Sequence, residues 1–320
     1  MDLFTSLFLL LFALTILISA ASEMVESSIY IAKKLNIPKA IIGATVLAYG
    51  TSSPEILVSL QANLNNEASI AIGNVIGSNI ANVCIGMGIL YFYGIKKFNI
   101  KPDFTTSILF LILSTFVVIF HMSDGVIAMH EGFVQMVILI ALNILLIREA
   151  RNFENEAQVT FSDYSFYGYK THSISLISLI LILSIIILIF SSNLVVIYAI
   201  ESATLLKINA SFIGLSIIAV GTSLPEILVT IASIKKKEFS IAIGNIVGSN
   251  ILNMLAVLGI PALFSTFDIS SGDLNYQMIF LFLSSLLIFI PFIIDKFQKT
   301  ISVAYFSMYI FTLYYFGVNA

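Results

Sequence analysis

This chain has little charge, one cysteine and three histidines, and each scarcity excludes a class of protein or site. Only 10% of its 320 residues are charged, while 59% are hydrophobic. A soluble domain of this length could not bury so much apolar surface, so the composition leaves no room for one. The single cysteine, Cys84, excludes an internal disulfide framework. The histidines are too scattered to suggest a histidine metal site; they are His121, His130 and His172.

Apolar stretches recur along the whole sequence, each of about 20 residues, the length that crosses a hydrocarbon core of about 30 Å. The start of the chain carries Asp2 and no basic residue, so we interpret the first stretch as a span rather than a secretory signal. The sequence therefore predicts an all-α, multi-pass membrane protein with ten spans, at 2–28, 39–62, 69–93, 104–121, 132–150, 173–200, 209–234, 240–266, 276–294 and 300–318.

The basic residues lie almost entirely in alternate loops between these spans. Of the 15 lysines and arginines, only Lys207 falls on the opposite side. Because excess positive charge marks cytoplasmic loops, both termini are predicted to be extracytoplasmic. The residues assigned to the cytoplasmic side are Lys33, Lys34, Lys39, Lys96, Lys97, Lys101, Arg148, Arg151, Lys170, Lys235, Lys236, Lys237, Lys296 and Lys299.

Two parts of the chain are nearly the same sequence. GATVLAYGTSSPEILVSL begins at Gly43, and GLSIIAVGTSLPEILVTI begins at Gly214, at a constant offset of 171 residues (214 − 43). Each is followed by a second matched segment, SIAIGNVIGSNIANV or SIAIGNIVGSNILNM. Five predicted spans separate the copies, so the second copy lies upside down in the membrane. We therefore predict two inverted five-helix repeats, 1–150 and 173–320, joined by a cytoplasmic linker, 151–172.

Each repeat places one glutamate, Glu55 or Glu226, inside a predicted span. Pro54 and Pro225 have no N–H and crowd the preceding turn, which predicts that helices two and seven are broken and present free carbonyls. Such carbonyls are tolerated at membrane depth only where they line a cavity or bind a ligand. Each glutamate lies at i+7 on a helix face whose other positions, i, i+3 and i+4, are an alanine, a threonine and a serine, so three of the four side chains offer oxygen. The next helix adds a serine and an asparagine. Besides the glutamates, the positions are Ala48, Thr51, Ser52, Ser78 and Asn82 in the first repeat, and Ala219, Thr222, Ser223, Ser249 and Asn253 in the second.

These residues predict a site for hard cations, because carboxylates and carbonyls are the ligands that such ions prefer. Glu55 and Glu226 would be costly to bury together as anions. One Ca²⁺ neutralises both, as do two monovalent ions, so the site suits Ca²⁺ or several Na⁺ in turn. Mutually exclusive occupancy is what an exchanger needs. We expect the nearby Asn74 and Asn245 to brace helices rather than to touch ions.

At these positions the chain resembles the cation/Ca²⁺ exchanger superfamily, in its prokaryotic sodium/calcium exchanger branch. The repeats of that superfamily carry G-T-S-x-P-E in one broken helix and G-S-N-x-x-N/D in the next. Here the motifs are GTSSPE at 50–55, GTSLPE at 221–226, GSNIAN at 77–82 and GSNILN at 248–253. The related proton/calcium branch typically shows G-N-x-x-E instead.

The resemblance implies particular roles for these residues. It implies that Glu55 and Glu226 bind Ca²⁺ together with the carbonyls of Thr51 and Thr222. It also implies that helices one and six slide across a core of helices two, three, seven and eight. Asn253 stands where potassium-dependent members carry an acid, so the resemblance implies exchange that does not use K⁺. The implied Na⁺ sites share Ala48, Ser52, Ser78, Ala219, Ser223 and Ser249.

The sequence thus predicts a Na⁺/Ca²⁺ antiporter, electrogenic at three Na⁺ per Ca²⁺, in a prokaryotic plasma membrane. We expect no enzymatic activity, no cofactor, no nucleic-acid partner and no obligatory protein partner, because the transported ions and the bilayer account for the motifs. A proton-coupled Ca²⁺ or Mn²⁺ exchanger of the same fold remains an alternative. A Ca²⁺-permeable channel is another.

Overall fold

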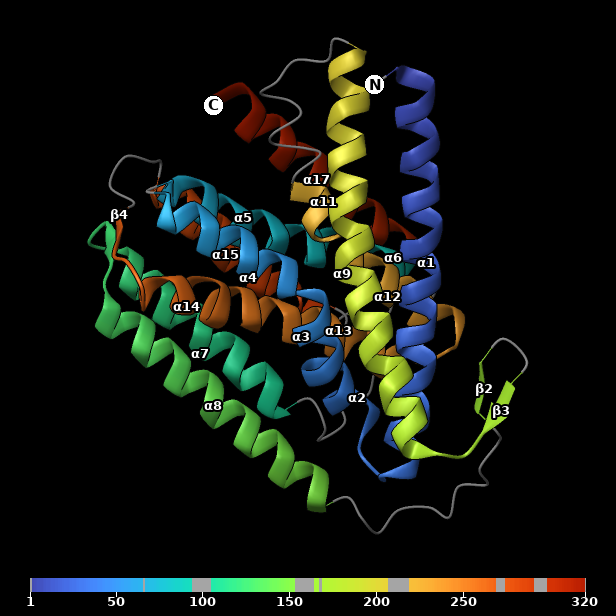
Figure 1. Ribbon diagram of the computed structural model, residues 1–320. Coiled ribbons are helices and arrows are strands. Elements are labelled where there is room, and N and C mark those ends of the chain that lie inside the picture. The colour runs from blue at the N-terminus through green and yellow to red at the C-terminus, as the bar shows by residue number, and fades with distance from the viewer. Residues whose placement is uncertain are drawn as a thin grey trace.

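Two long helices stand beside the rest of the protein in the computed structural model, which describes residues 2–65, 67–93, 105–152, 164–166, 169–206, 219–268, 274–290 and 298–319 (Figure 1). They are α1 (Leu3–Lys34) and α9 (Ile174–Leu205), each of 32 residues. The Ser6 Oγ near the start of α1 lies 2.7 Å from the Ser202 Oγ near the end of α9, so the pair is antiparallel. Their bounds differ by the same 171 residues (174 − 3 and 205 − 34) that separate the sequence repeats.

Most of the other helices, such as α4, α5, α8 and α14, run across the axis of this pair (Figure 1). Three of the segments, η1, η2 and η5, are π-helical, a form that is often found at functional sites. In chain order these elements are α2 (Lys39–Ile42), η1 (Gly43–Leu47), α3 (Ala48–Thr51), α4 (Ser53–Leu64), α5 (Ala68–Ala81), η2 (Asn82–Met87), α6 (Gly88–Phe92), α7 (Thr105–Met122), α8 (Met129–Asn152), α11 (Ala219–Thr222), α12 (Leu224–Lys235), α13 (Phe239–Leu252), η5 (Asn253–Val257), α14 (Leu258–Ala262), α15 (Leu274–Leu287) and α17 (Gln298–Asn319).

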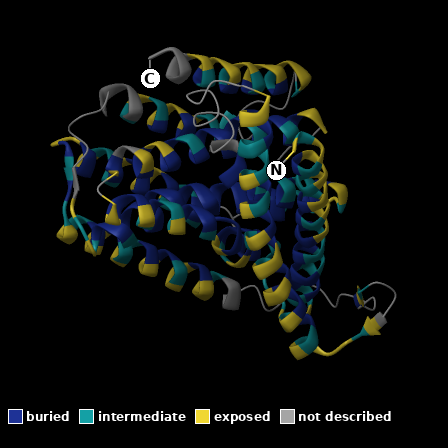
Figure 2. Ribbon diagram, turned by 45° about the horizontal axis from the view of Figure 1, so that its top comes forward, coloured by how far each residue is buried: buried dark blue, intermediate teal, exposed yellow. Residues whose placement is uncertain are grey.

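The exposed surface of the helices is apolar, as expected of a protein surrounded by lipid. Phe4 on α1 is 81% exposed, and Phe133 on α8 and Phe190 on α9 are also largely exposed. By contrast, residues 241–252 of α13 are all buried. Figure 2 shows buried residues gathered in the interior and exposed residues along the outer faces of the helices. Among the described residues, five helices are long and apolar enough to span a membrane, or six if the bent pair 39–51 and 53–64 counts as one span. The predicted total of ten spans stays a prediction.

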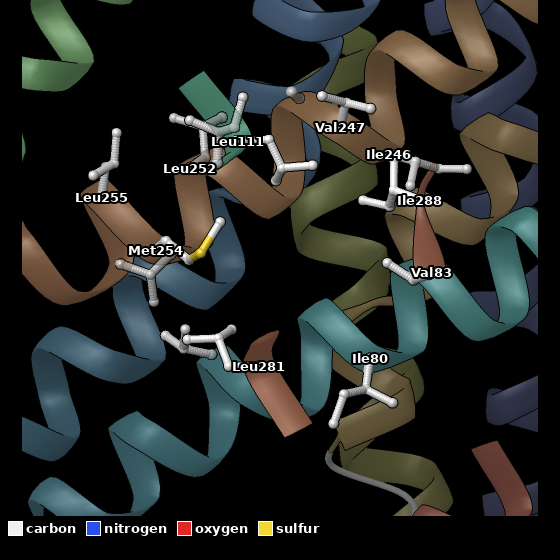
Figure 3. Packing of buried hydrophobic residues seen from close by; sticks show 14 of the residues in the cluster. Ile80, Val83, Leu111, Ile246, Val247, Leu252, Met254, Leu255, Leu281 and Ile288 are labelled. Atoms are coloured by element: carbon white, nitrogen blue, oxygen red, sulfur yellow. The ribbon is translucent and has the colours of Figure 1, made fainter. Parts of the chain in front are cut away.

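Close packing around α13 depends on glycine. A Cβ added to Gly248 would lie 2.5 Å from the carbonyl oxygen of Ala44, and one added to Gly43 would lie 2.5 Å from that of Ile241. Small residues allow such close approach of helix backbones in membranes. The surrounding core is aliphatic, and Figure 3 shows some of its members, including Val83 of η2 and Ile246 of α13.

Four short strands form two separate two-stranded sheets among the described residues. The strands β1 (Val126–Ile127) and β4 (Phe267–Asp268) pair antiparallel. In the predicted linker, β2 (Tyr164–Phe166) and β3 (Tyr169–Thr171) form an antiparallel hairpin that sequence reasoning had treated as plain loop. Tyr164 is buried against Tyr30 of α1, with the ring centroids 5.7 Å apart, and its hydroxyl donates to the Glu23 carboxylate.

Several sequence predictions fall on parts of the chain outside the described residues. These include most of the linker 151–172, the first part of the span 209–234 and the last part of the span 276–294. Five lysines used for the predicted orientation lie there too: Lys96, Lys97, Lys101, Lys207 and Lys296.

Candidate cation site

Both predicted helix breaks are present. The helix of the first repeat ends at Thr51 and restarts at Ser53, with a bend of 44° between its two parts. Ser52 has φ −83° and ψ 4°, outside the α-helical region, and Ser223 repeats this with φ −85° and ψ 0°. Pro54 and Pro225 stand at the start of the second part, where a missing N–H costs nothing.

The breaks place each glutamate in the first turn of a helix. Glu55 lies in the first turn of α4 and Glu226 in that of α12. The N-terminal end of a helix carries a partial positive charge, which favours a carboxylate there. Both side chains are buried, with exposures of 0% and 1%. The site is therefore the place in the described core where two acidic groups are held away from solvent.

The carboxylates have few protein partners. Ser52 Oγ donates to Glu226 Oε1 at 3.0 Å, which joins the first repeat to the second. Within the described residues, both oxygens of Glu55, the Oε2 of Glu226 and the Oγ of Ser223 are buried without a hydrogen bond. Buried polar atoms in proteins are nearly always paired, so this concentration of unpaired oxygens marks these residues as the candidate cation site.

Threonine and serine side chains connect the two repeats on both sides of the carboxylates. Thr51 Oγ1 lies 3.3 Å from Ser249 Oγ, and Ser78 Oγ lies 3.5 Å from Thr222 Oγ1. These contacts are equivalent under the offset of 171 residues. The structure thus brings together side chains that lie in opposite halves of the sequence.

Asn74 and Asn245 brace the glutamate-bearing helices, as their positions suggested. Asn74 Nδ2 donates to the carbonyl of Glu55 at 3.1 Å, and Asn245 Nδ2 donates to that of Glu226 at 3.3 Å. Their Oδ1 atoms accept from threonines of the opposite repeat, Thr222 and Thr51 respectively, both at 3.4 Å. Each asparagine therefore ties one repeat to the other.

Two backbone carbonyls close to the predicted site already accept hydrogen bonds from protein groups. The carbonyl of Ala48, a buried residue, accepts from Ser52 N at 2.9 Å and from Thr51 Oγ1 at 3.3 Å. The carbonyl of Gly221, which Pro225 leaves without a helical donor, accepts from Ser192 Oγ of α9 at 3.3 Å. Ala219 is the first residue of α11.

The remaining predicted ligands, Asn82 and Asn253, begin the π-helical segments η2 and η5. Both are buried, and both side-chain atoms of Asn253 have no partner among the described residues. Asn82 Nδ2 instead donates to Asn250 Oδ1 at 3.2 Å. Sequence reasoning missed Asn250 and its equivalent Asn79, although both stand inside the GSN motifs and repeat at the same offset.

The atoms of the candidate site that could bind a cation are all oxygens. No group of three or more histidine, cysteine, aspartate or glutamate side chains suited to a metal ion occurs in the described part of the chain. Two carboxylates, hydroxyls, amide oxygens and carbonyls instead match hard cations such as Ca²⁺, which takes 6–8 oxygen ligands in a flexible geometry, better than they match zinc or copper.

A helical bundle with an apolar exterior, broken helices and a buried pair of carboxylates defines a membrane protein that transports cations. The sequence pattern described as sodium/calcium exchanger protein matches residues 5–148 and 176–318. The chain therefore belongs to the sodium/calcium exchanger family, whose members are cation/Ca²⁺ antiporters.

Individual relatives agree with this assignment. The chain is 31% identical to the inner membrane protein YrbG of Escherichia coli over 263 residues, which are 82% of this chain and 80% of that protein. It is 28% identical to the sodium/calcium exchanger MaX1 of Methanosarcina acetivorans, over 84% of this chain and 85% of that one. The solved structure of the sodium-calcium exchanger NCX_Mj soaked with Na⁺ and Sr²⁺ matches with a TM-score of 0.81 and 26% identity, covering 98% of this chain and 99% of that chain.

Proposed function

We propose that this protein exchanges Na⁺ for Ca²⁺ by alternating access, with three Na⁺ per Ca²⁺ and without K⁺. The main support is the pair of buried carboxylates, Glu55 and Glu226, whose oxygens are largely without protein partners. One Ca²⁺ neutralises both charges, so Ca²⁺ and Na⁺ compete for the same oxygens. The relatives named as sodium/calcium exchangers support the proposal, MaX1 by similar sequence and NCX_Mj by similar structure.

The proposed ligands follow from the same geometry. Ca²⁺ binds Glu55 and Glu226 with the carbonyls of Thr51 and Thr222, since the helix breaks lie beside these residues. The Na⁺ sites use the neighbouring groups and share part of the Ca²⁺ site; their residues are Ala48, Ser52, Ser78, Ala219, Ser223 and Ser249, with Asn82 and Asn253 completing the cage.

Asn253 supports independence from K⁺. An amide at this position leaves the cage with two carboxylates, which one Ca²⁺ balances without a further cation. Three Na⁺ against one Ca²⁺ moves one net charge per cycle, so a membrane potential of 100 mV would supply roughly 2.3 kcal/mol. The exchange is then driven by the potential as well as by the Na⁺ gradient.

The proposed architecture is two inverted five-helix repeats, 1–150 and 173–320, around the linker 151–172, with both termini outside a prokaryotic plasma membrane. The equal lengths and constant offset of α1 and α9 support it. These two helices contact each other along an apolar seam that includes Leu17 and Leu188. They are the elements that slide across the core.

Uptake of ⁴⁵Ca²⁺ into proteoliposomes tests the proposal. Vesicles loaded with Na⁺ and diluted into Na⁺-free medium should take up Ca²⁺, and vesicles loaded with choline should not. An inside-positive potential should change the rate, and external K⁺ at constant potential should not. Uptake that ignores the Na⁺ gradient but follows a pH gradient would favour the proton-coupled alternative. Uptake without any counter-ion would favour a channel.

A further inference from the structure

Four buried asparagines lie beside the proposed cage, two from each repeat. Asn79 and Asn250 are related by the offset of 171 residues (250 − 79), as are Asn82 and Asn253 (253 − 82). Asn79 Nδ2 donates to the carbonyl of Asn250 at 3.5 Å, and Asn250 Nδ2 donates to the carbonyl of Asn79 at 3.4 Å. This reciprocal pair is symmetric and links α5 to α13 at the centre of the protein.

The next bond breaks that symmetry. Asn82 Nδ2 donates to Asn250 Oδ1 at 3.2 Å. The equivalent bond would join Asn253 Nδ2 to Asn79 Oδ1, but both atoms are buried and have no partner among the described residues. One donor and one acceptor of matching chemistry are thus left unpaired at the positions where symmetry would join them.

Two other contacts break the symmetry in the same way. Ser52 Oγ donates to Glu226, whereas Ser223 and Glu55, which are the equivalent residues, do not bond each other. Asn74 Nδ2 donates to Ser59 Oγ at 3.0 Å, whereas the equivalent hydroxyl, that of Thr230, has no partner in the described structure. Three contacts around the cage are therefore asymmetric, although the threonine–serine contacts and the bonds from Asn74 and Asn245 to the glutamate carbonyls are made in both repeats.

From this arrangement we infer that Asn250 and Asn79 are positioning residues that act in turn: Asn250 orients Asn82 in the conformation described here, and Asn79 orients Asn253 in the conformation open to the other side of the membrane. The inference rests on the proposed function, because inverted repeats move against each other around a fixed site to change the side of access. When two nearly identical repeats exchange conformations, each asymmetric bond is replaced by its equivalent. The π-helical turns that begin at Asn82 and Asn253 are the local structures that such a change would adjust.

These bonds decide whether a cation in the cage meets the oxygen or the nitrogen of the Asn82 and Asn253 side-chain amides. The nitrogen of Asn82 is held by Asn250, so its unpaired oxygen is the end left for an ion. Asn253 has neither end held, so its amide can rotate. In the opposite conformation the two amides exchange these states, and the cation always meets one fixed amide oxygen and one mobile amide.

Asn79→Ala and Asn250→Ala form a matched pair for testing this. Each removes one of the two reciprocal bonds, so their structural cost is alike. In the present conformation only Asn250→Ala also removes the acceptor of Asn82. The apparent KM for Ca²⁺ would be measured at each face separately, in right-side-out and inside-out vesicles. We expect Asn250→Ala to raise KM about fivefold to tenfold at one face, the effect of one buried hydrogen bond, and Asn79→Ala to do so at the opposite face.

A second measurement separates positioning from a general loss of structure. If Asn250 acts through Asn82, the double variant Asn82→Ala/Asn250→Ala should have the KM of Asn82→Ala alone at the affected face. Equal changes at both faces for both single variants, or additive changes in the double variant, would overturn the inference while wild-type exchange stands. Absence of Na⁺-dependent Ca²⁺ flux in the wild type would instead overturn the proposed function, and the inference with it.

Discussion

Replacing Gly244 by alanine is expected to destabilise the protein and to disable transport, because the new methyl group would meet backbone rather than side chain. A Cβ at this position would press against the carbonyl oxygen of Ala40 and lie 3.0 Å from the nitrogen of Ala44. Neither atom can turn away by a rotamer change. The backbones of α13 and α2 would have to separate by about 1 Å to restore an ordinary contact of about 3.5 Å.

The expected magnitude combines two opposing effects. Overpacking costs about 1–3 kcal/mol, and a contact with rigid backbone belongs at the upper end of that range. Alanine in a helix interior returns about 1 kcal/mol relative to glycine. The net loss for Gly244→Ala is therefore about 2 kcal/mol, or roughly 4–8 °C in apparent Tm at about 2–4 °C per kcal/mol.

The same displacement would reach the cation site through the next residue. Asn245 binds Thr51 at 3.4 Å, and Ser249 on the same helix lies 3.3 Å from Thr51. A shift of about 1 Å would lengthen both contacts beyond hydrogen-bonding range. Misplacement of this size commonly costs about 100-fold in rate, so we expect Ca²⁺ exchange to fall by that order.

Unfolding can be followed at one defined position. Cys84 is the only cysteine and is fully buried, so a thiol-reactive fluorogenic dye reports its exposure as the protein unfolds. Gly86→Ala is the matched control, because its Cβ would meet the side chain of Ile246 rather than backbone, at 2.9 Å from Cδ1 and 3.1 Å from Cγ1, and a side chain can move. We expect this control to unfold near the wild-type temperature. A Gly244→Ala protein that unfolds with the wild type, or a control that falls equally, would refute the reasoning.

Three further predictions follow from the same contacts. Glu55→Gln and Glu226→Gln should each reduce Ca²⁺ exchange by at least about 1,000-fold with folding intact. Two unit charges about 4 Å apart contribute about 4 kcal/mol at an effective dielectric constant of about 20, and Ca²⁺ carries two charges. Near-normal ⁴⁵Ca²⁺ flux in either variant would contradict the site. Asn253→Asp should make exchange sensitive to pH or alter its coupling to monovalent cations, and an unchanged transport profile would count against the role of this amide. Lys236→Met should lower stability by less than about 1 kcal/mol, because its 2.6 Å ion pair with Glu26 is partly exposed, and a large fall in apparent Tm would show that estimate to be wrong.

The sequence predicted the parts of the site that depend on local chemistry. Pro54, four residues after Gly50, predicted a helix break, and the helix is interrupted at Ser52. Sequence reasoning did less well where contacts between distant parts of the chain decide the structure. The first helix was predicted to end at residue 28 but continues to Lys34, since Tyr30 gains burial against the hairpin of the linker, a contact between distant parts of the chain.

Partners across the two repeats were beyond sequence reasoning. Asn79 and Asn250 stand in the motifs at the same positions, and nothing in their spacing shows that each binds the backbone of the other. The carbonyl of Gly221 was predicted to be free because of Pro225, and Ser192 occupies it instead. Such contacts depend on how helices pack, and packing joins residues that are far apart in sequence.

The asymmetric contacts have a consequence for the direction of transport in the proposed antiporter. The asymmetric bond from Asn82 to Asn250, for example, has an unmade equivalent of the same chemistry, from Asn253 to Asn79. Exchanging one for the other changes the free energy of the protein little, because the same groups are paired and the same number are left unpaired. The two access states are then close in energy, and neither is favoured by the cage itself. A ligand shifts such an equilibrium only by its different affinity for the two states, so the ion gradients, rather than the protein, would set the direction of exchange.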